Sequence, residues 1–576
     1  MVRFRIPTIT VDIGGVPMGS GHPLRIQSMT TTDTMDTLST ARQVMQLADA
    51  GCDYVRITAP NIRSAENLAN IKKELRHKGY KVPLIADIHF TPKAAEIAAK
   101  IVEKVRINPG NYQDKKTLEG RQWTEAEFKR AQERIYDRFA PLVRICREHG
   151  TAMRIGVNHG SLSDRILWKY GDTPEGMVES AYEFIRICEA EGYDKIVLSM
   201  KASNPKVMIS AYRLLVKRMR QEGKFYPIHL GVTEAGNLIE GRIKSAVGIG
   251  TLLAEGIGDT VRVSLAEDPV NEVPVAKMLK DLFELWQLGG TPAYAVENFI
   301  YEESPIVVVS SNKDVGADYH FSMGFVSGLP GQVLPVDKWV PGTIALYELN
   351  QPISETHKNK WLRIPIERFE NIAFGTLSSF DKVVVEISEE AKLVYVTDKI
   401  VNIKQGGRTK VIVKFDSNRT GEELAVYSSA ILGRLFIDTI ADGVWIDAPE
   451  NPSFIKDISF DILQASRARI TKVDYIACPS CGRTLFDLEE VVARVRARTG
   501  HLKGVKIAVM GCIVNGLGEM ADADYGYVGS GPGKVNIYRK RTLVKRNVPE
   551  DQAIDELIKL IKEDGLWVEP PVQIEQ

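Results

Sequence analysis

The sequence predicts an α/β protein whose first half is a (β/α)8 barrel of the TIM type. Short apolar segments recur through about the first 270 residues, and stretches with helical periodicity separate them. The expected strands span residues 24–29, 53–57, 84–88, 104–107, 152–157, 195–200, 228–232 and 260–265. Strands that alternate with helices pair in parallel through right-handed crossovers, and eight such units fit a closed barrel. The alternative is a doubly wound sheet, but no G-x-G-x-x-G motif follows the first strand.

The ends of these strands carry an unusual set of polar and charged residues. In a parallel barrel the functional residues lie at the carboxyl ends of the strands. A cation inside a strand is costly to bury unless an anion meets it. Four arginines lie inside apolar strands, Arg56, Arg106, Arg154 and Arg262, and the Lys, Asn and Ser donors at the strand ends include Asn158, Lys201 and Ser264. This set predicts a site for a phosphate or diphosphate. The competing interpretation is that the arginines form internal salt bridges with Asp53, Asp87 or Glu234.

Glu234 stands apart from these donors because it is a carboxylate among cations. Beside a bound polyanion such a group can hold a proton and act as a general acid. His89, His159 and His229 are further candidate donors. His229 lies in the middle of a strand, which favours a core histidine whose hydrogen bonds are satisfied.

A breaker cluster at residues 289–292 ends the first pattern. Strand-like runs follow at residues 306–310, 361–366, 382–387, 392–396, 410–415 and 443–446, with a helix expected from residue 421 or 422 to 439. We interpret residues 285–452 as an inserted α/β middle domain with a spacer or scaffolding role. No chemical constellation is evident in it.

The third domain, residues 453–576, contains the most specific chemical signal. Cys478 and Cys481 form a C-x-x-C pair, and Cys512 follows a short apolar run that ends in glycine. Glu519 is within reach of the third thiol. A structural zinc site normally has four Cys or His ligands, whereas a cubane iron–sulfur cluster accepts three cysteines and a different fourth ligand. We therefore expect a 4Fe–4S cluster with these four residues as ligands, and a zinc knob or a dithiol is the alternative.

Composition excludes several classes of protein. Lysine plus arginine and aspartate plus glutamate both number 74, so zero net charge argues against non-specific binding of nucleic acid. No apolar run reaches the roughly 18 residues that a membrane span needs, and the first residues do not resemble a secretion signal. Six cysteines are too few for a disulfide framework. Cys52, Cys146 and Cys188 are expected to be buried, so we predict a reducing cytoplasm.

The third domain is also locally basic. The cations are Arg494, Arg496, Arg498, Lys534, Arg539, Lys540, Arg541, Lys545 and Arg546. A solvated surface is the usual explanation. The sharper hypothesis is a docking face for an acidic electron carrier, which would raise the association rate.

Together these motifs resemble the 4-hydroxy-3-methylbut-2-enyl diphosphate synthases, a family of iron–sulfur oxidoreductases of isoprene biosynthesis by the non-mevalonate pathway. The matching stretches are residues 25–30, 86–90, 104–111, 154–161, 478–483 and 511–519. The chain is similar to the long form, which has an extra domain between barrel and cluster domain.

The resemblance implies a reductive ring opening of 2-C-methyl-D-erythritol 2,4-cyclodiphosphate with loss of water. Reduced ferredoxin or flavodoxin would supply electrons through the cluster, which Cys478, Cys481, Cys512 and Glu519 would bind. The seven barrel residues named above match the diphosphate binders, and Glu234 matches the acid that protonates the departing hydroxyl. Glu519 would leave the cluster to admit a substrate oxygen.

The oligomeric state is left open between monomer and homodimer. In short family members a partner chain supplies the cluster, whereas here the inserted domain would join barrel and cluster within one chain. The rival function is an organic-phosphate-binding protein with a structural or redox-sensing metal domain. A radical S-adenosylmethionine enzyme is disfavoured because residues 30–34, after the first strand, contain no cysteine.

Overall fold

A computed structural model of the 576-residue chain describes residues 4–570 except 89–90, 113–121, 289–300, 302, 372–376, 378, 390–392, 406–408, 480–483, 514–517, 519 and 521. The chain forms two compact units. The large unit contains residues 6–241, 257–277 and 472–576, and the small unit contains residues 1–5, 242–256 and 278–471.

The large unit contains the predicted first barrel. Its parallel strands are β3 (Arg25–Met29), β4 (Tyr54–Thr58), β5 (Leu84–Asp87), β6 (Lys104–Ile107), β7 (Ala152–Asn158), β8 (Ile196–Lys201), β9 (His229–Leu230) and β10 (Thr260–Val261). They pair in the order β8-β7-β6-β5-β4-β3-β10-β9. A parallel bridge between Leu198 and Ile228 joins the two ends, so the barrel is closed and the sequence prediction is confirmed.

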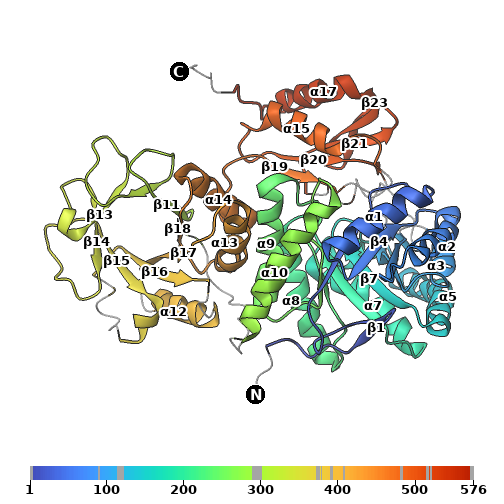
Figure 1. Cartoon of the computed structure of the whole chain (residues 1–576). Coiled ribbons are helices and arrows are strands. Elements are labelled where there is room, and N and C mark those ends of the chain that lie inside the picture. Colours follow the sequence, from blue (N-terminus) through green and yellow to red (C-terminus); the bar gives the residue numbers. More distant parts are fainter. Residues whose placement is uncertain are drawn as a thin grey trace. The chain divides into compact units, whose positions relative to one another are not determined.

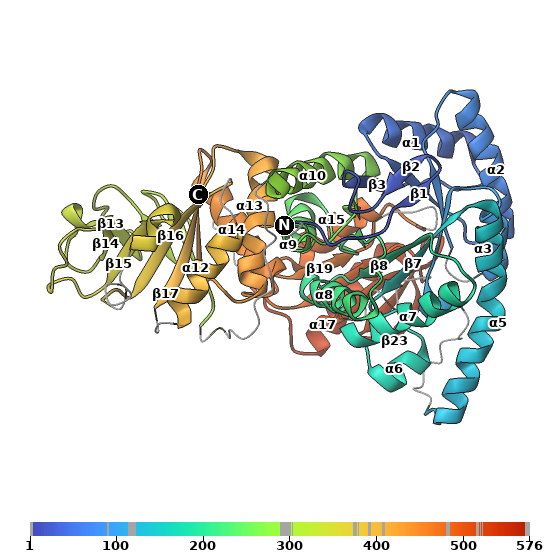
Figure 2. The ribbon, with the colours of Figure 1, turned by 90° about the horizontal axis from the view of Figure 1, so that it is seen from below.

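Helices follow these strands, as their alternation with apolar segments predicts. They are α1 (Thr37–Ala50), α2 (Ile62–His77), α3 (Pro92–Ala98), α4 (Pro109–Tyr112), α5 (Glu125–His149), α6 (Asp164–Tyr170), α7 (Pro174–Ala190), α8 (Pro205–Glu222), α9 (Leu238–Ala254) and α10 (Glu272–Leu288). Thr124 and Glu127 form a capping box at the start of α5, and Gly150 ends it in the left-handed conformation. Helices α2, α3 and α5 pack side by side outside the strands (Figures 1 and 2).

An apolar layer closes the amino-terminal end of this barrel. A hairpin of β1 (Val11–Ile13) and β2 (Val16–Met18) supplies part of it. Val11, Ile13 and Met18 pack with Tyr54 and with apolar side chains from β5, β7 and β8. Because this end is filled, solvent and ligands reach the interior from the carboxyl end of the strands.

The small unit contains a second barrel that the sequence only partly predicts. Its strands are β11 (Ile306–Ser310), β12 (Tyr319–Phe321), β13 (Gln332–Pro335), β14 (Ile344–Glu348), β15 (Lys360–Pro365), β16 (Lys382–Ser388), β17 (Lys410–Asp416) and β18 (Gly443–Asp447). All pairs are parallel, and β11 pairs with β18 to close the barrel. Strands β12, β13 and β14 are short or irregular and were missed. The predicted strand at 392–396 is wrong, because residues 393–405 form helix α12 (Leu393–Gln405).

Three helices follow the last strands of the second barrel. Besides α12 they are α13 (Gly421–Ile437) and α14 (Pro452–Ala465), which packs on α13, β11 and β18. Helix α13 is buried from Leu424 to Ile437. It crosses the part of α9 that belongs to the same unit, where a Cβ on Gly250 would lie 2.7 Å from Ala430 Cα. Glycine is therefore required for this close approach.

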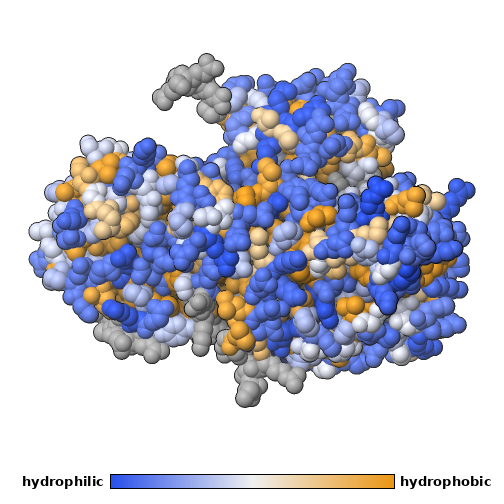
Figure 3. Space-filling model, in the orientation of Figure 1, coloured by the Kyte–Doolittle hydropathy of each residue, from blue (hydrophilic) through white to orange (hydrophobic). Residues whose placement is uncertain are grey.

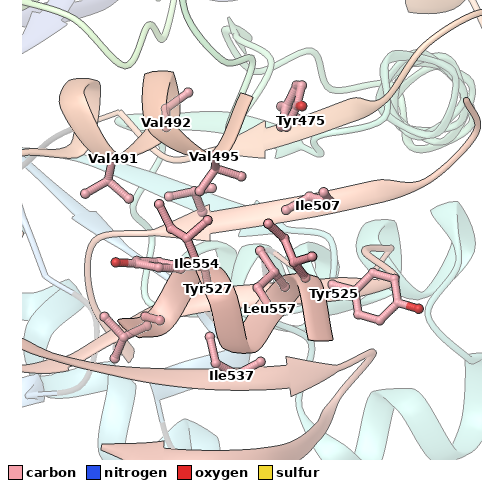
Figure 4. Close-up of a cluster of buried hydrophobic side chains, with 14 of the residues drawn as sticks. Tyr475, Val491, Val492, Val495, Ile507, Tyr525, Tyr527, Ile537, Ile554 and Leu557 are labelled. Carbon is pink, nitrogen blue, oxygen red and sulfur yellow. The ribbon is translucent and has the colours of Figure 1, made fainter. Parts of the chain in front are cut away.

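The carboxyl-terminal part of the large unit is a five-stranded mixed sheet with two helices. The strands are β19 (Asp474–Ala477), β20 (Lys506–Met510), β21 (Tyr525–Gly531), β22 (Lys534–Arg539) and β23 (Thr542–Pro549). The first three are parallel and the last three antiparallel. Helices α15 (Leu488–Thr499) and α17 (Glu550–Glu563) bury an apolar core against the sheet (Figure 4). Cys478, which follows β19, packs against this core.

The surface seen in Figure 3 is mostly hydrophilic, with small apolar patches between charged side chains. Over the residues that the structure describes, no helix combines the length and the apolar character that crossing a bilayer demands.

Candidate active site

Cationic side chains fill the interior of the first barrel. Strand residues two apart point to the same face, so Lys104 and Arg106 share the inward face of β6. A Cβ on Gly156 would lie 2.6 Å from Arg106 Nε, and one on Gly231 would lie 2.7 Å from Lys201 Nζ. These glycines leave the room that the long cations occupy. All seven predicted anion-binding residues are buried: Arg56, Arg106, Arg154, Asn158, Lys201, Arg262 and Ser264.

Two of the four arginines have carboxylate partners. Arg106 donates to Asp87 Oδ1 at 3.1 Å and to Asn158 Oδ1 at 3.2 Å. Arg262 forms two hydrogen bonds with Glu272, at 3.1 and 3.0 Å. The salt-bridge interpretation is thus correct for Arg106, and Arg262 pairs with a carboxylate that the sequence analysis did not consider.

The other two arginines lack an ion pair among the described residues. Arg56 donates to Met29 Sδ at 3.1 and 2.8 Å. Burial lowers the pKa of Arg56 to about 10. Arg154 is 1% exposed, and its Nε and Nη1 atoms have no hydrogen-bond partner within the described part of the chain. Burial, and then repulsion by Arg56 and Arg106, holds the pKa of Arg154 well below its usual value.

A second group of buried bases lies around these arginines. Burial and four surrounding arginines lower the pKa of Lys201 far below its usual value. His229 is fully buried, and neither ring nitrogen has a hydrogen-bond partner among the residues described. The expectation of a satisfied core histidine is therefore wrong. Lys104 is also fully buried without a hydrogen-bond partner in the described structure, and the sequence analysis overlooked it.

These unsatisfied groups indicate a ligand site. Buried polar groups are nearly always hydrogen-bonded, because an unmade bond costs free energy. Several positive charges without carboxylates in one interior favour an anion as the missing partner. The signal for Lys104 was in the sequence, since it lies two residues before Arg106 on the same strand.

Glu234 lies in the loop after β9 and is 2% exposed. Its φ of 49° is in the left-handed region, which a residue with a Cβ adopts rarely. Such strain occurs at functional sites where the surrounding structure enforces it. A parallel bridge between Ala235 and Ala477 provides that enforcement.

The same bridge connects the barrel to the cysteine loops. Ala235 directly follows Glu234, and Ala477 directly precedes Cys478. Both residues belong to the large unit. The candidate acid and the first candidate cluster ligand are therefore adjacent to paired residues, although they are more than 240 positions apart in the chain.

Cys478 and Cys512 belong to neighbouring loops. They follow β19 and β20, which pair in parallel. The Gly511 backbone N–H donates to Cys478 Sγ at 3.2 Å. A backbone donor to a cysteine sulfur is a usual feature of iron–sulfur sites, so this pair fits the predicted cluster. The described residues contain no group of three or more His, Cys, Asp or Glu side chains that could hold a metal. Cys481, Glu519 and His89 lie outside those residues.

Ion pairs also attach the carboxyl-terminal sheet to the barrel. Glu240, at the start of α9, contacts Lys472 and Arg496, the latter at 2.7 Å. Asp172 accepts from Arg541 at 2.7 Å, and its backbone oxygen lies 3.2 Å from His159 Nε2. A Cβ on Gly518 would lie 2.6 Å from Ser161 Oγ, so the third-cysteine segment also approaches the loop after β7.

These pairs alter the interpretation of the basic stretch. Five of its nine cations have carboxylate partners: Arg496, Arg498, Arg539, Arg541 and Lys545. Much of the charge therefore stabilises the domain itself and its contact with the barrel.

Comparison with known proteins assigns this chain to a family. The model of the GcpE TIM-barrel domain matches residues 8–277, and that of the GcpE protein C-terminal domain matches residues 474–563. The 4-hydroxy-3-methylbut-2-en-1-yl diphosphate synthase (flavodoxin) of Akkermansia muciniphila is 46% identical over 98% of this chain and 97% of its own length. Enzymes of the same name from Phocaeicola vulgatus and Leptospira interrogans are both 43% identical, over 97% and 98% of this chain and 98% of their own lengths. The chain therefore belongs to the 4-hydroxy-3-methylbut-2-en-1-yl diphosphate synthase family.

Proposed function

We propose that this chain catalyses the two-electron reductive ring opening of 2-C-methyl-D-erythritol 2,4-cyclodiphosphate to 4-hydroxy-3-methylbut-2-enyl diphosphate. The observation that carries the proposal is the bridge between Ala235 and Ala477, which joins the loop of the candidate acid to the loop of a candidate cluster ligand. The cationic barrel interior beneath it supports a diphosphate substrate.

The barrel residues would bind the diphosphate in two ways. Arg154 and Lys201, which have no ion pair among the described residues, would contact phosphate oxygens directly. Arg106 and Arg262 are held by Asp87 and Glu272, so their guanidinium groups are already oriented. Arg56, Asn158 and Ser264 complete the set. A preorganised site of this kind avoids the cost of ordering long side chains when the substrate binds.

Glu234 would donate the proton that converts the departing hydroxyl into water. Its burial excludes bulk solvent, and its enforced backbone conformation fixes the direction of the side chain. Proton transfer by a positioned carboxyl contributes roughly a hundredfold to ten-thousandfold to a rate.

Cys478, Cys481, Cys512 and Glu519 would hold the 4Fe–4S cluster. The contact between Gly511 and Cys478 Sγ supports the first of these ligands, and the adjacent loops support Cys512. When bound, the cluster supplies the two electrons of the reaction. The cysteine loops would exclude water from the barrel interior, which strengthens its electrostatic interactions.

The electron donor would be flavodoxin or ferredoxin. The relatives above carry flavodoxin in their names, which favours that carrier. We place the reaction in the cytoplasm, whose reducing potential suits the free thiols Cys52, Cys146 and Cys188.

We also propose that barrel and cluster of one chain form one active site. The contacts of Glu240, Asp172 and Ala235 with the carboxyl-terminal sheet support closure within a chain. The test mixes a Cys512→Ala chain with a Glu234→Ala chain. Closure within the chain predicts that the mixture stays inactive. Activity that appears on mixing would instead require a site shared between two chains.

The decisive experiment is purification without oxygen, followed by iron and sulfide analysis and visible spectroscopy. We expect about four irons and four sulfides per chain and a spectral change when the cyclic diphosphate is added under reduction. Zinc, or a cluster whose spectrum ignores that ligand, would contradict the proposal. It would favour the rival, a phosphate-binding protein with a structural or sensing metal domain.

A Glu519→Ala variant separates these two functions further. An exchangeable oxygen ligand is needed only where an iron must be opened to the substrate. The enzyme therefore predicts loss of turnover with most of the iron retained. A sensor would keep both its metal and its response.

A further inference from the structure

Lys104 is a buried base beneath the proposed diphosphate site with no assigned role. It is the first residue of β6 and shares the inward face with Arg106. The side chain is 0% exposed, and its Nζ atom lies 4.7 Å from the centroid of the Tyr54 ring. Nζ makes no hydrogen bond to any residue that the structure describes. An amine in such surroundings is costly to keep charged unless an anion offsets it.

The ionisable groups inside this barrel are mostly cationic. By strand they are Tyr54 and Arg56 on β4, Asp87 on β5, Arg106 on β6, Arg154 on β7, Lys201 on β8, His229 on β9, and Arg262 with its partner Glu272 beyond β10. The carboxylates of Asp87 and Glu272 bond to Arg106 and Arg262. The groups that act on Lys104 are Arg154 and Arg56, which repel its charged form. Below it lie apolar side chains of the hairpin layer.

The proposed reaction changes the charge of this interior. Each phosphorus of the cyclic diphosphate carries one ionised oxygen. Cleavage of the ring C–O bond leaves its electron pair on a phosphate oxygen, so that phosphorus becomes a terminal phosphate, whose second ionisation has a pKa of about 6. The substrate dianion, two electrons from the carrier and one proton give the product trianion and water. Glu234, having donated that proton, is also negative.

We propose that Lys104 compensates this charge: it is a neutral amine when the cyclic diphosphate is bound and takes up one proton when the linear diphosphate forms. Lys104 is thus a positioning residue, because it acts on the diphosphate through the field inside the barrel. The proton comes from solvent and returns to it when product leaves, so the overall reaction is unchanged. This inference rests on the proposed function.

The energetics favour such a switch. Burial, and then repulsion by Arg154 and Arg56, holds the pKa of Lys104 well below its usual value, which favours the neutral amine before the ligand changes. A new negative charge in a low-dielectric interior raises that pKa again. Arginine stays charged under all conditions and is unsuited to this role, whereas lysine changes protonation readily when buried.

Titration calorimetry on the intact, oxygen-free enzyme with its cluster oxidised tests the inference. Substrate and product bind without turnover when no reductant is present. At pH 8, heats measured in buffers of different ionisation enthalpy give the protons taken up with each ligand. We expect the product to bring about one more proton than the substrate. In Lys104→Met this difference should vanish, and product affinity should fall about tenfold while substrate affinity changes less than about threefold.

Lys93→Met is the matched control, because it removes an equally long lysine whose side chain is 66% exposed. It should keep the wild-type proton difference. A Lys104→Gln variant repeats the test if the methionine variant is unstable. Equal uptake with both ligands in the wild type, or a difference that persists without Lys104, overturns the inference and leaves the proposed function intact. Failure of both ligands to bind the wild type overturns the proposed function and this inference with it.

Discussion

Arg154 shows how a residue can be unfavourable for folding and useful for binding. It is almost completely buried and forms no ion pair with any described residue. Removing such a charge from water costs several kcal/mol, at order of magnitude, when no counter-ion replaces the lost hydration. A bound diphosphate would supply the counter-ion. The same uncompensated charge therefore lowers the stability of the protein without ligand and raises its affinity for an anion.

We predict opposite effects of Arg154→Met on stability and on substrate binding. The variant removes an uncompensated buried cation, so the free energy of unfolding should stay constant or rise, by at most about 4 kcal/mol. Substrate affinity should fall by about a hundredfold or more, because a charge-assisted contact is lost. Denaturant titration and calorimetry measure the two effects.

Arg165→Met is the contrasting variant. Arg165 is as deeply buried but donates to Glu183 Oε2 at 2.8 Å. Its loss would leave a buried carboxylate without its partner, so unfolding should become easier by about 3–5 kcal/mol. If the two variants lost equal stability, Arg154 would have a structural partner.

At the scale of elements, the sequence predicted the first barrel because each strand reads as an apolar run that a helix follows. Burial on both faces gives parallel strands that signature. The second barrel lacks this signature, since β12 has only three residues and no α-helix separates β11 from β14 among the described residues. The run that begins at Leu393 contains three valines and a tyrosine, which favour strands, yet it forms α12 and packs against β17.

The sequence indicated the buried cations of the first barrel where one residue type recurred at one place in the fold. The four arginines were found because each interrupts an apolar strand. Lys104 was missed because a lysine at a strand start usually reaches solvent. Glu272 was missed because it belongs to α10, and only tertiary structure brings it to Arg262. A pair between the end of a strand and the following helix leaves no local pattern in the sequence.

The contact between α4 and the loop after β7 can be tested for its role in positioning that loop. A Cβ on Gly110 would lie 1.7 Å from the backbone oxygen of Ser161, which a rotamer change cannot relieve. Gly110→Ala should displace the loop that follows Asn158 and cost about 1–3 kcal/mol of stability. Substrate affinity should also fall, measured by calorimetry against Gly15→Ala. Gly15 has open space around it. Gly15→Ala should therefore lose stability only through the backbone strain of its positive φ. Unchanged binding in Gly110→Ala would mean that the loop tolerates the shift.

For the whole molecule, Glu240 makes an ionic contact between barrel and cysteine domain that acid would break. Burial alone would raise its pKa, but Lys472 and Arg496 lower it overall. A carboxylate with a lowered folded-state pKa contributes its full stabilisation above the unfolded value of about 4.3 and loses it as the pH falls through the folded value. The contact should therefore hold at neutral pH and weaken only in acid.

We predict that Glu240→Gln separates catalysis from binding. The barrel site is untouched, so the affinity for substrate should remain within about threefold of wild type. Turnover should fall about tenfold or more, because the cysteine loops are less firmly held over the barrel. Anaerobic kinetics and calorimetry on one preparation measure both. A loss of affinity that equals the loss of turnover would place Glu240 in the binding site instead.

The crossing of α9 and α13 at Gly250 and Gly433 has a consequence for any shortened version of this chain. Each glycine admits the opposing helix to a distance that any side chain would prevent, with Val247 Cγ2 only 2.8 Å from a Cβ on Gly433. Removal of the second barrel with α13 would leave this small-residue face of α9 uncovered in water. A shortened chain without α13 would therefore need changes in α9 as well.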